Sequence, residues 1–96
     1  MQFEWNPTKA ALNLKNHKVS FNEAATVFSD PLGVTVPDPD HSDEEDRLII
    51  VGISYRSRLL IVSHTENEDV VRIISARELT PREREQYEQG DFNRAC

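Results

Sequence analysis

The side chains of this sequence that are best suited to chemistry are its arginines, which fall in or next to segments patterned like strands and helices. The set of interest comprises Arg47, Arg58, Arg72, Arg77 and Arg84. A guanidinium group donates hydrogen bonds in a planar fork that matches a phosphate, and it stays charged at working pH. In the alternative interpretation, each arginine pairs with a surface acid such as Glu66 or Glu83. The arginines therefore predict an anion site on a sheet, unless carboxylates neutralise them one by one.

Acid and base chemistry has fewer candidate groups. Histidine exchanges protons near neutral pH, and the chain contains His17, His41 and His64. A single histidine at a helix end or in a strand is more often structural, and His17 is preferred because Lys15 lies nearby. The sequence has no phosphate-binding loop, no serine-hydrolase elbow and no paired cysteines. Any catalysis must then use Arg, Lys, His and carboxylate groups. Phosphodiester transfer in RNA can do so, because its nucleophile is the 2'-hydroxyl of the substrate.

An acidic segment interrupts the chain at residues 38–46. It holds six acids and no Lys or Arg, whereas eleven cations meet eleven acids in the rest of the chain. The formal net charge of -6 therefore says little about the sheet. Carboxylates beside His41 could bind a hard cation, but the segment lacks the ligand order and the glycine of a calcium loop. We predict a solvated or partner-facing loop, with no metal site and no cofactor.

The length of the chain allows one domain with a modest core. We assign this domain to residues 1–90 of the 96 and a tail to residues 91–96. The lone cysteine, Cys96, cannot form an intrachain disulfide and fits a reducing cytoplasm. No apolar run approaches the roughly 18 residues of a membrane span, and the N-terminus lacks a signal-peptide pattern. We expect a cytoplasmic protein that does not contact the membrane.

The arginines are organised around a predicted β-hairpin at residues 58–77. Two runs rich in Ile, Val and Leu flank a polar segment, which is typical of a hairpin. A turn at Asn67-Glu68 would place Ser63 opposite Arg72, and a three-residue turn would place His64 there instead. The sequence leaves both registers open.

Capping signals and apolar spacing place the other elements. Asn6 and Pro7 start a first helix, and capping boxes at residues 20–23 and 80–83 start a second and a third. The expected helices are 7–18, 20–30 and 81–90, and the further expected strands are 1–5, 32–36 and 47–54. The third helix has one aromatic residue, Tyr87, and no aliphatic residue inside it, so that a partner could complete it or it could move aside. We predict an α+β domain with an antiparallel sheet of about four strands, two N-terminal helices and one C-terminal helix.

Taken together, the motifs of this chain resemble the BrnT toxins over about residues 2–89. The matching positions are Phe3 to Pro7, Lys9, Asn13, Lys15 to Phe21, Glu23 to Phe28, Asp30-Pro31, Asp38 to Ser42, Glu45 to Arg47, Gly52, Arg58, Thr65-Glu66, Arg72 to Arg77 and Arg82 to Tyr87. The joint order of these motifs is more specific than any one of them. The chain departs from the family where Lys18 and Ser57 stand at common glycines, and where Asn67-Glu68 replaces a frequent Arg-Gly pair.

The resemblance implies a RelE-like ribonuclease toxin of a bacterial type II toxin-antitoxin pair. Such a toxin would cleave RNA without a metal and stop translation. It would be neutralised, in a hetero-oligomer, by a BrnA-like antitoxin with a ribbon-helix-helix DNA-binding end. Operator DNA would be contacted only through that antitoxin.

The first hypothesis for this chain is a ribonuclease toxin. Arg72 and Arg77 would bind the scissile phosphate and stabilise the transition state, while His17 or Lys15 and Glu83 are candidates for moving protons. The additional RNA-binding residues would be Arg47, Arg58 and Arg84.

The second hypothesis is a non-catalytic module that binds the antitoxin and acts in operon autoregulation. The overall acidity of the chain and the acid at the hairpin tip, Glu68, motivate it. The acidic loop and the polar third helix would then be the docking surfaces.

Overall fold

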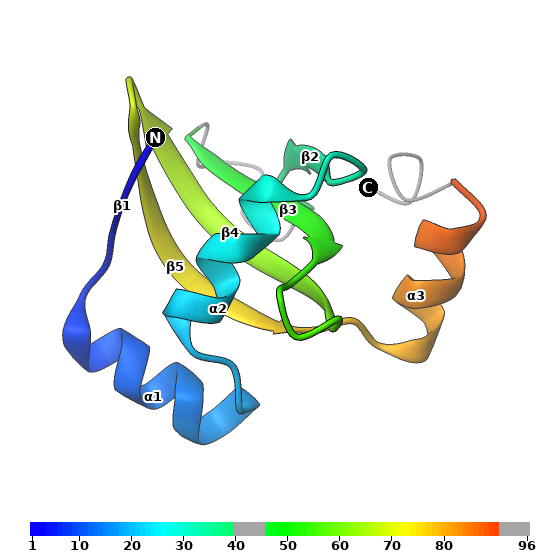
Figure 1. Cartoon of the computed structure of the whole chain (residues 1–96), viewed down its shortest axis with the longest axis horizontal. Helices are drawn as coiled ribbons and strands as arrows, with labels where there is room; N and C mark the ends of the chain where they lie inside the picture. The colour runs from blue at the N-terminus through cyan, green and yellow to red at the C-terminus, as the bar shows by residue number, and fades with distance from the viewer. Residues whose placement is uncertain (40–45, 91–96) are drawn as a thin grey trace.

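The computed structural model describes residues 1–39 and 46–90. Helices α1 and α2 cover one face of a sheet, and α3 lies apart from them, on the far side of the molecule from α1 (Figure 1). The elements in chain order are β1 (Gln2–Glu4), α1 (Pro7–His17), α2 (Phe21–Thr26), the 3-10 turn η1 (Val27–Ser29), β2 (Val34–Pro37), β3 (Arg47–Ile53), β4 (Leu59–Asn67), β5 (Val70–Glu78) and α3 (Pro81–Glu88). Most of the acidic loop, with His41, and the tail with Cys96 lie outside the described residues.

Within the described residues, the sheet has five strands in the order β1-β5-β4-β3-β2, and it is mixed. Strands β2 to β5 pair antiparallel, whereas β1 runs parallel to β5. The prediction of an antiparallel sheet of about four strands was therefore wrong in its strand count and in the direction of β1. A strand of three residues carries too little pattern to show its partner, and this partner is almost seventy residues away along the chain.

Short-range capping places α1 as the sequence predicts. The Asn6 side chain accepts hydrogen bonds from the N–H groups of Thr8 and Lys9 at 2.8 and 3.2 Å. The helix ends at Lys18, which adopts the left-handed conformation with φ of 60°. Lys18 thus occupies a backbone position that favours glycine.

A buried asparagine joins α1 to the sheet. Asn13 donates from Nδ2 to the carbonyl oxygens of Val19 and Ala76 at 2.9 and 2.8 Å. Its Oδ1 accepts from the N–H of Ala76 at 3.0 Å. These bonds fix the helix against β5 and satisfy the amide away from water.

The main core lies between the helices and the sheet. It contains Val19, Phe21, Ala24 and Val27 from the helical layer, and Ile50, Leu60, Val62, Val71, Ile73 and Ala76 from the strands. Gly52 lets η1 approach β3, because a Cβ at this position would lie 2.9 Å from Asp30 Oδ2.

The opposite side of the sheet, called the open face here, carries a smaller apolar cluster. Ile49, Val51 and Ile61 form it, and Leu79 and Tyr87 pack against it. The Tyr87 hydroxyl donates to the carbonyl oxygen of Leu32 at 3.1 Å. No residue of α3 is buried, which agrees with the polar composition of this helix.

The hairpin has neither of the two expected registers. Asn67 lies opposite Val70, so the turn is Glu68-Asp69, with Glu68 at a φ of 56°. Thr65, rather than Ser63 or His64, lies opposite Arg72. The register then shifts at a β-bulge between Ser63 and His64. Bulges depend on long-range pairing, and the alternation of the sequence does not report them.

Candidate functional site

Two of the predicted arginines share a row across the open face. Arg47 lies opposite Thr65 on β4, and Thr65 lies opposite Arg72 on β5. Directly opposed residues in a sheet point to the same face, and two strand spacings amount to roughly 10 Å. Arg47 and Arg72 therefore flank the Thr65 hydroxyl on one surface.

Arg72 has an ion partner in this row. Its Nη1 donates to Glu4 Oε2 at 2.7 Å, and Glu4 is the residue opposite it on β1. About half of each side chain is exposed, at 49 and 52%. An exposed ion pair of this kind contributes roughly 0 to 1 kcal/mol, so a competing anion could displace Glu4.

Arg77 occupies the same face nearer the end of β5, opposite Ile61. Its two terminal nitrogens donate to the two oxygens of Glu83 at 2.8 and 3.0 Å. Glu83 Oε1 also accepts from the N–H of Thr80 at 2.9 Å, which completes the predicted capping box of α3. The hydrogen bonds from Arg77 lower the pKa of Glu83 to about 2. Glu83 is thus a fixed anion that orients the guanidinium of Arg77.

A polar row separates the two arginines of β5. Ser63 and Ser75 lie opposite each other between the row of Arg72 and the row of Arg77. The Ser63 hydroxyl donates to Oδ2 of Asp38 at 3.4 Å, and the Asp38 side chain is buried. A carboxylate and two hydroxyls therefore lie on the open face between cations.

Arg58 lies apart from this surface. Its Nε donates to Glu23 Oε2 at 2.9 Å, and its Nη2 contacts Glu23 Oε1 and donates to the Lys18 carbonyl oxygen at 3.0 Å. Ser54 Oγ donates to Glu23 Oε2 at 2.7 Å. The Arg58 hydrogen bonds lower the pKa of Glu23, against the effect of burial. Arg58 therefore compensates a buried carboxylate and joins α2 to the start of β4.

The capping box predicted at Ser20 is half formed. The Ser20 hydroxyl accepts from the N–H of Glu23 at 3.0 Å, as expected. The Glu23 carboxylate does not return to the Ser20 amide, because it is 2% exposed and binds Arg58 instead. A long-range ion pair thus replaces the predicted local bond.

The remaining predicted site residues occupy other elements. Lys15 and His17 are exposed near the end of α1, on the helical layer. Arg84 is exposed on α3 and donates from Nε to Glu88 at 3.1 Å. His64 is fully buried, with ring nitrogens 3.2 Å from the Val62 carbonyl oxygen and 3.0 Å from Glu66 Oε2. His64 also packs edge-on against Phe28, so its role is structural.

Sequence reasoning missed Glu4, Asp38 and the two serines of the open face. Glu4 belongs to a strand of three residues, so no pattern linked it to Arg72. Asp38 was counted with the acidic loop, although its N–H donates to the Arg47 carbonyl oxygen and extends the pairing of β2 with β3. The alternation of β4 could have shown that Ser63 and Thr65 share a face with Ile61.

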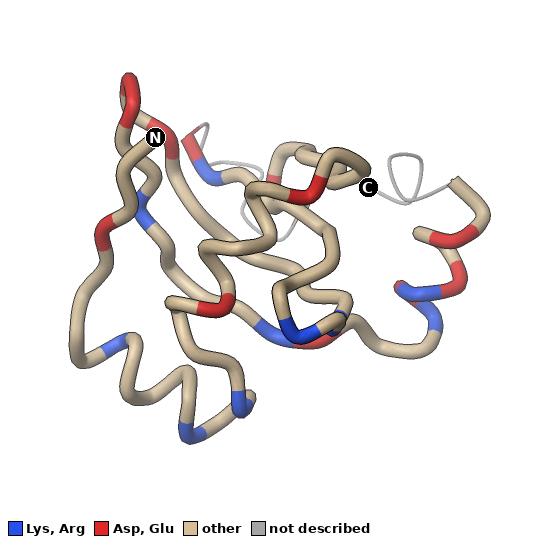
Figure 2. The backbone as a smooth tube through the Cα atoms, in the orientation of Figure 1, with Lys and Arg blue, Asp and Glu red and all other residues tan. Residues whose placement is uncertain are grey.

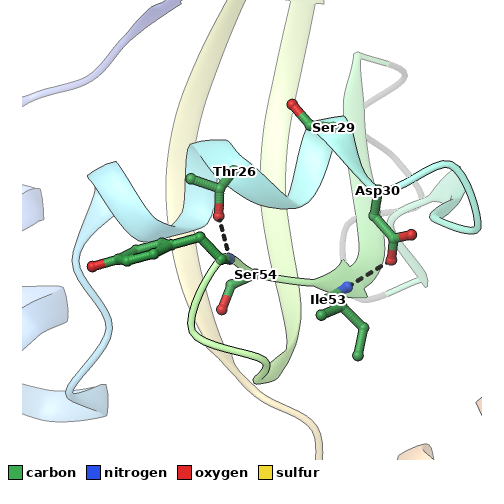
Figure 3. A pocket seen from close by; sticks show the side chains of 6 residues that line it. Thr26, Ser29, Asp30, Ile53 and Ser54 are labelled. Atoms are coloured by element: carbon green, nitrogen blue, oxygen red, sulfur yellow. Dashed lines mark hydrogen bonds between the residues drawn. The ribbon is translucent and has the colours of Figure 1, made fainter.

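A shallow cleft opens elsewhere, between η1 and the end of β3 (Figure 3). Its volume is about 350 Å³, and Thr26, Ser29, Asp30, Ile53, Ser54 and Tyr55 line it. The Asp30 carboxylate accepts from the N–H of Ile53 at 2.7 Å, and the Thr26 hydroxyl accepts from the N–H of Tyr55 at 3.0 Å. These groups serve the backbone, so the cleft offers little unpaired polarity to a ligand.

In residues 1–39 and 46–90, no three His, Cys, Asp or Glu side chains are grouped so that they could hold a metal ion. No helix in these ranges has the length and apolar character needed to cross a bilayer.

The fold defines the chain as a small α+β protein whose mixed sheet carries arginines on its open face. Its structure is similar to the crystal structure of the ribonuclease toxin BrnT of Brucella abortus, with a TM-score of 0.66. The two chains are 19% identical, and the match covers 83% of this chain and 97% of the Brucella chain. The family model described as the ribonuclease toxin BrnT of type II toxin-antitoxin systems matches residues 5–83. The chain therefore belongs to the BrnT family. No curated protein sequence matches it.

Proposed function

We propose that this chain is a metal-independent endoribonuclease that cleaves RNA and so inhibits translation in the cytoplasm. The observation that supports this proposal best is the arrangement of the open face, where Arg72 and Arg77 lie on one surface with Ser63 and Ser75 between them. Single-stranded RNA follows cationic surfaces through its phosphates. The face thus has guanidinium groups for successive phosphates of one strand.

The proposed reaction uses the 2'-hydroxyl of the substrate as the nucleophile. This oxygen attacks the adjacent phosphorus as its proton leaves to a base. The bond from phosphorus to the 5'-oxygen then breaks, and that oxygen takes up a proton. The products are a 2',3'-cyclic phosphate and a 5'-hydroxyl end. Guanidinium groups stabilise the phosphorane because they donate to oxygens on which charge develops.

The Arg77–Glu83 pair fits this reaction in two ways. A phosphate that engages Arg77 competes with Glu83 for the same fork of donors. Once Glu83 loses those bonds, its pKa rises from about 2 toward its ordinary value, and the carboxylate becomes a better proton acceptor. Glu83 is therefore our candidate for moving protons beside Arg77.

The other candidate residues contribute from further away. Arg47 extends the cationic row of Arg72, and Arg84 would meet RNA along α3. Lys15 and His17 lie on the helical layer and would reach an RNA that bends around the end of the sheet. Arg58 would add positive charge there while it compensates Glu23.

The partner that we propose is a BrnA-like antitoxin with a ribbon-helix-helix end. A type II toxin implies an antitoxin, and the family description supplies that class of partner. The antitoxin would neutralise the toxin in a hetero-oligomer and would carry the pair to operator DNA.

The experiment that tests the function is cleavage of a single-stranded RNA by the purified chain with EDTA present. We expect cleavage to persist, the new ends to carry a cyclic phosphate, and a 2'-deoxy substitution at the cut site to stop the reaction. Arg77→Ala should lower the rate by at least roughly 100-fold, because it removes a donor to the developing charge. Lys9→Ala, an exposed change in the first turns of α1, is the control. If the Arg77→Ala variant cleaves RNA at the wild-type rate, the proposed active site at Arg77 is wrong.

One observation favours the second candidate, a non-catalytic module that binds the antitoxin. Arg72 and Arg77 are both paired with carboxylates, Glu4 and Glu83. A purified chain that cleaves no RNA at any dose, yet binds the antitoxin tightly, would establish this function instead.

A further inference from the structure

Positive charge gathers at one end of the molecule. Lys and Arg mark the end of α1, the turn between β3 and β4, the end of β5 and the start of α3, whereas Asp and Glu mark the hairpin tip (Figure 2). The cations of these segments are Lys15 and Lys18 at the end of α1, Arg56 and Arg58 between β3 and β4, Arg77 in β5 and Arg82 in α3. We call this surface the basic end.

Contacts between side chains join these segments into one surface. Arg58 reaches the Lys18 carbonyl oxygen at 3.0 Å on one side and Glu78 at 3.5 Å on the other. Arg77 donates to the Glu78 carbonyl oxygen at 3.2 Å and so extends the same chain of contacts to the open face. The basic end is therefore continuous with the site that contains Arg77.

Three carboxylates at the basic end offset part of its positive charge. Glu23 is buried, Glu83 lies in its bidentate pair with Arg77, and Glu78, which is 58% exposed, lies 3.5 Å from Arg58. Within the described residues, Lys15, Lys18 and Arg82 have no carboxylate within salt-bridge distance, and all three are exposed. Arg56 is 58% exposed and lies 3.9 Å from Glu23. Several cations are thus available to an external anion.

An exposed aromatic ring accompanies these cations. Tyr55 precedes Arg56 in the turn between β3 and β4, and it is 72% exposed. Its N–H donates to Thr26 Oγ1 at 3.0 Å, which fixes the backbone of the turn on α2. A fixed aromatic residue beside exposed cations is the combination on which unpaired bases stack while phosphates are bound.

We propose that the basic end is a second RNA-contacting surface, which binds the strand leaving the open face and stacks one base on Tyr55. This inference rests on the proposed function. The strand passes Arg77, crosses the end of the sheet, and meets Arg56 and Lys18. The acidic hairpin tip repels RNA at the opposite end, so the charge distribution also selects the direction in which the molecule approaches its substrate.

Single-stranded RNA fits this surface better than an acidic protein does. The cations are long, exposed side chains, and the apolar area beside them consists of Tyr55 and Ile53 on the wall of a shallow cleft rather than a deep pocket. Protein interfaces centre on buried anchors in pockets, whereas single strands bind through charge and stacking.

The test measures binding of a short 2'-O-methylated single-stranded RNA, which cannot be cleaved, by fluorescence anisotropy over a range of KCl concentrations. The double variant Lys18→Asn with Arg56→Gln should make the fall of log affinity with log salt less steep. The magnitude of the slope should decrease by about 1.4, because each lost phosphate contact removes about 0.7. Tyr55→Ala should weaken binding by roughly 5-fold or more and leave the slope unchanged. Lys9→Gln makes the same kind of charge change at the start of α1 and should alter neither quantity. Circular dichroism establishes that each variant is folded.

The possible outcomes separate this inference from the proposed function. A wild-type chain that neither binds nor cleaves RNA would overturn both. If the wild-type chain cleaves RNA but the variants at the basic end bind RNA like Lys9→Gln, the inference about the basic end is overturned and the proposed function is not. Polyglutamate can be added as a competitor at the same concentration of negative charges as the RNA. If it displaces the RNA, the surface binds acidic proteins, and the inference is likewise overturned.

Discussion

Arg72 and Arg77 lie on the same face of the sheet although they are five positions apart along β5. In a regular strand, residues five positions apart point to opposite faces. The bulge beside Ser63 and His64 adds one residue to β5, so that Thr65 lies opposite Arg72 and Ile61 lies opposite Arg77. The irregularity of the strand therefore creates the arginine pair on the open face.

The first prediction concerns the pair of Arg72 with Glu4. Glu4→Gln removes the ion partner and leaves Arg72 available to a phosphate, so RNA affinity should rise by roughly two- to five-fold, in line with the strength of an exposed ion pair. Fluorescence anisotropy with uncleavable RNA measures the change. Glu68→Gln removes the same charge at the hairpin tip and serves as the control. Equal affinities for the two variants would show that Glu4 does not compete with RNA.

The second prediction concerns the pH dependence of α3. The pKa of Glu83 falls from 4.5 to about 2 on folding, so its ion pair stabilises the protein above pH 4.5. This stabilisation decreases as the pH falls from 4.5 toward 2. Glu83→Gln should lower the free energy of unfolding at neutral pH by on the order of 1 to 2 kcal/mol, because the pair is partly exposed. Urea unfolding at a series of pH values measures it.

The difference between Glu83→Gln and the wild type should narrow as the pH falls toward 2, where about half of the Glu83 side chains become protonated. Glu85→Gln is the matched change on the exposed side of α3 and should cost little at any pH. A difference that stays constant between neutral pH and pH 2 would mean that the Arg77–Glu83 pair does not stabilise the fold.

The third prediction concerns the buried carboxylate of Glu23. Arg58→Ala leaves Glu23 inside the protein without its main partner, and this should cost roughly 3 kcal/mol of stability at neutral pH. The double change with Glu23→Gln should recover part of the loss, because the uncompensated charge is gone. Arg56→Ala, at a 3.9 Å contact with Glu23, should cost much less. Thermal unfolding of the variants would decide, and similar losses for Arg56 and Arg58 would contradict the assignment.

The fourth prediction concerns backbone conformation. Lys18, Ser57 and Glu68 have φ of 60, 63 and 56°, a region in which a side chain costs about 1 to 2 kcal/mol. Glycine at each position should therefore raise the free energy of unfolding by roughly 0.5 to 1 kcal/mol, after its larger loss of backbone entropy is subtracted. Asn22→Gly, inside α2, should be destabilising and is the control. A loss of stability in all three variants would refute this assignment of strain.

Most helix boundaries could be predicted because the interactions that set them are local. Asn6 caps α1 through N–H groups two and three residues later, and Thr80 with Glu83 caps α3 in the same way. The resemblance to the BrnT family also placed glycines at Lys18 and Ser57, where the structure has positive φ. Contacts within one turn depend only on neighbouring residues, so the local sequence is enough to predict them.

The missed features depend on residues far apart in the chain. The parallel pairing of Gln2 with Val70 and the bulge in β5 follow from how five strands meet, and no local pattern specifies either. The role of Glu23 was assigned to a cap, yet its partner Arg58 is 35 residues away. In the same way, the sequence identified Arg72 and Arg77 but not the carboxylates of Glu4 and Asp38 that share their surface.

The parallel strand β1 also governs when the fold can be completed during synthesis. The first strand has no partner until β5 has left the ribosome, and Asn13 must likewise wait for Ala76, 63 residues later. Such distant contacts form late and slowly. The sheet of a nascent chain therefore cannot be completed until its last strand has left the ribosome, and Arg72 and Arg77 reach their places on the open face only then.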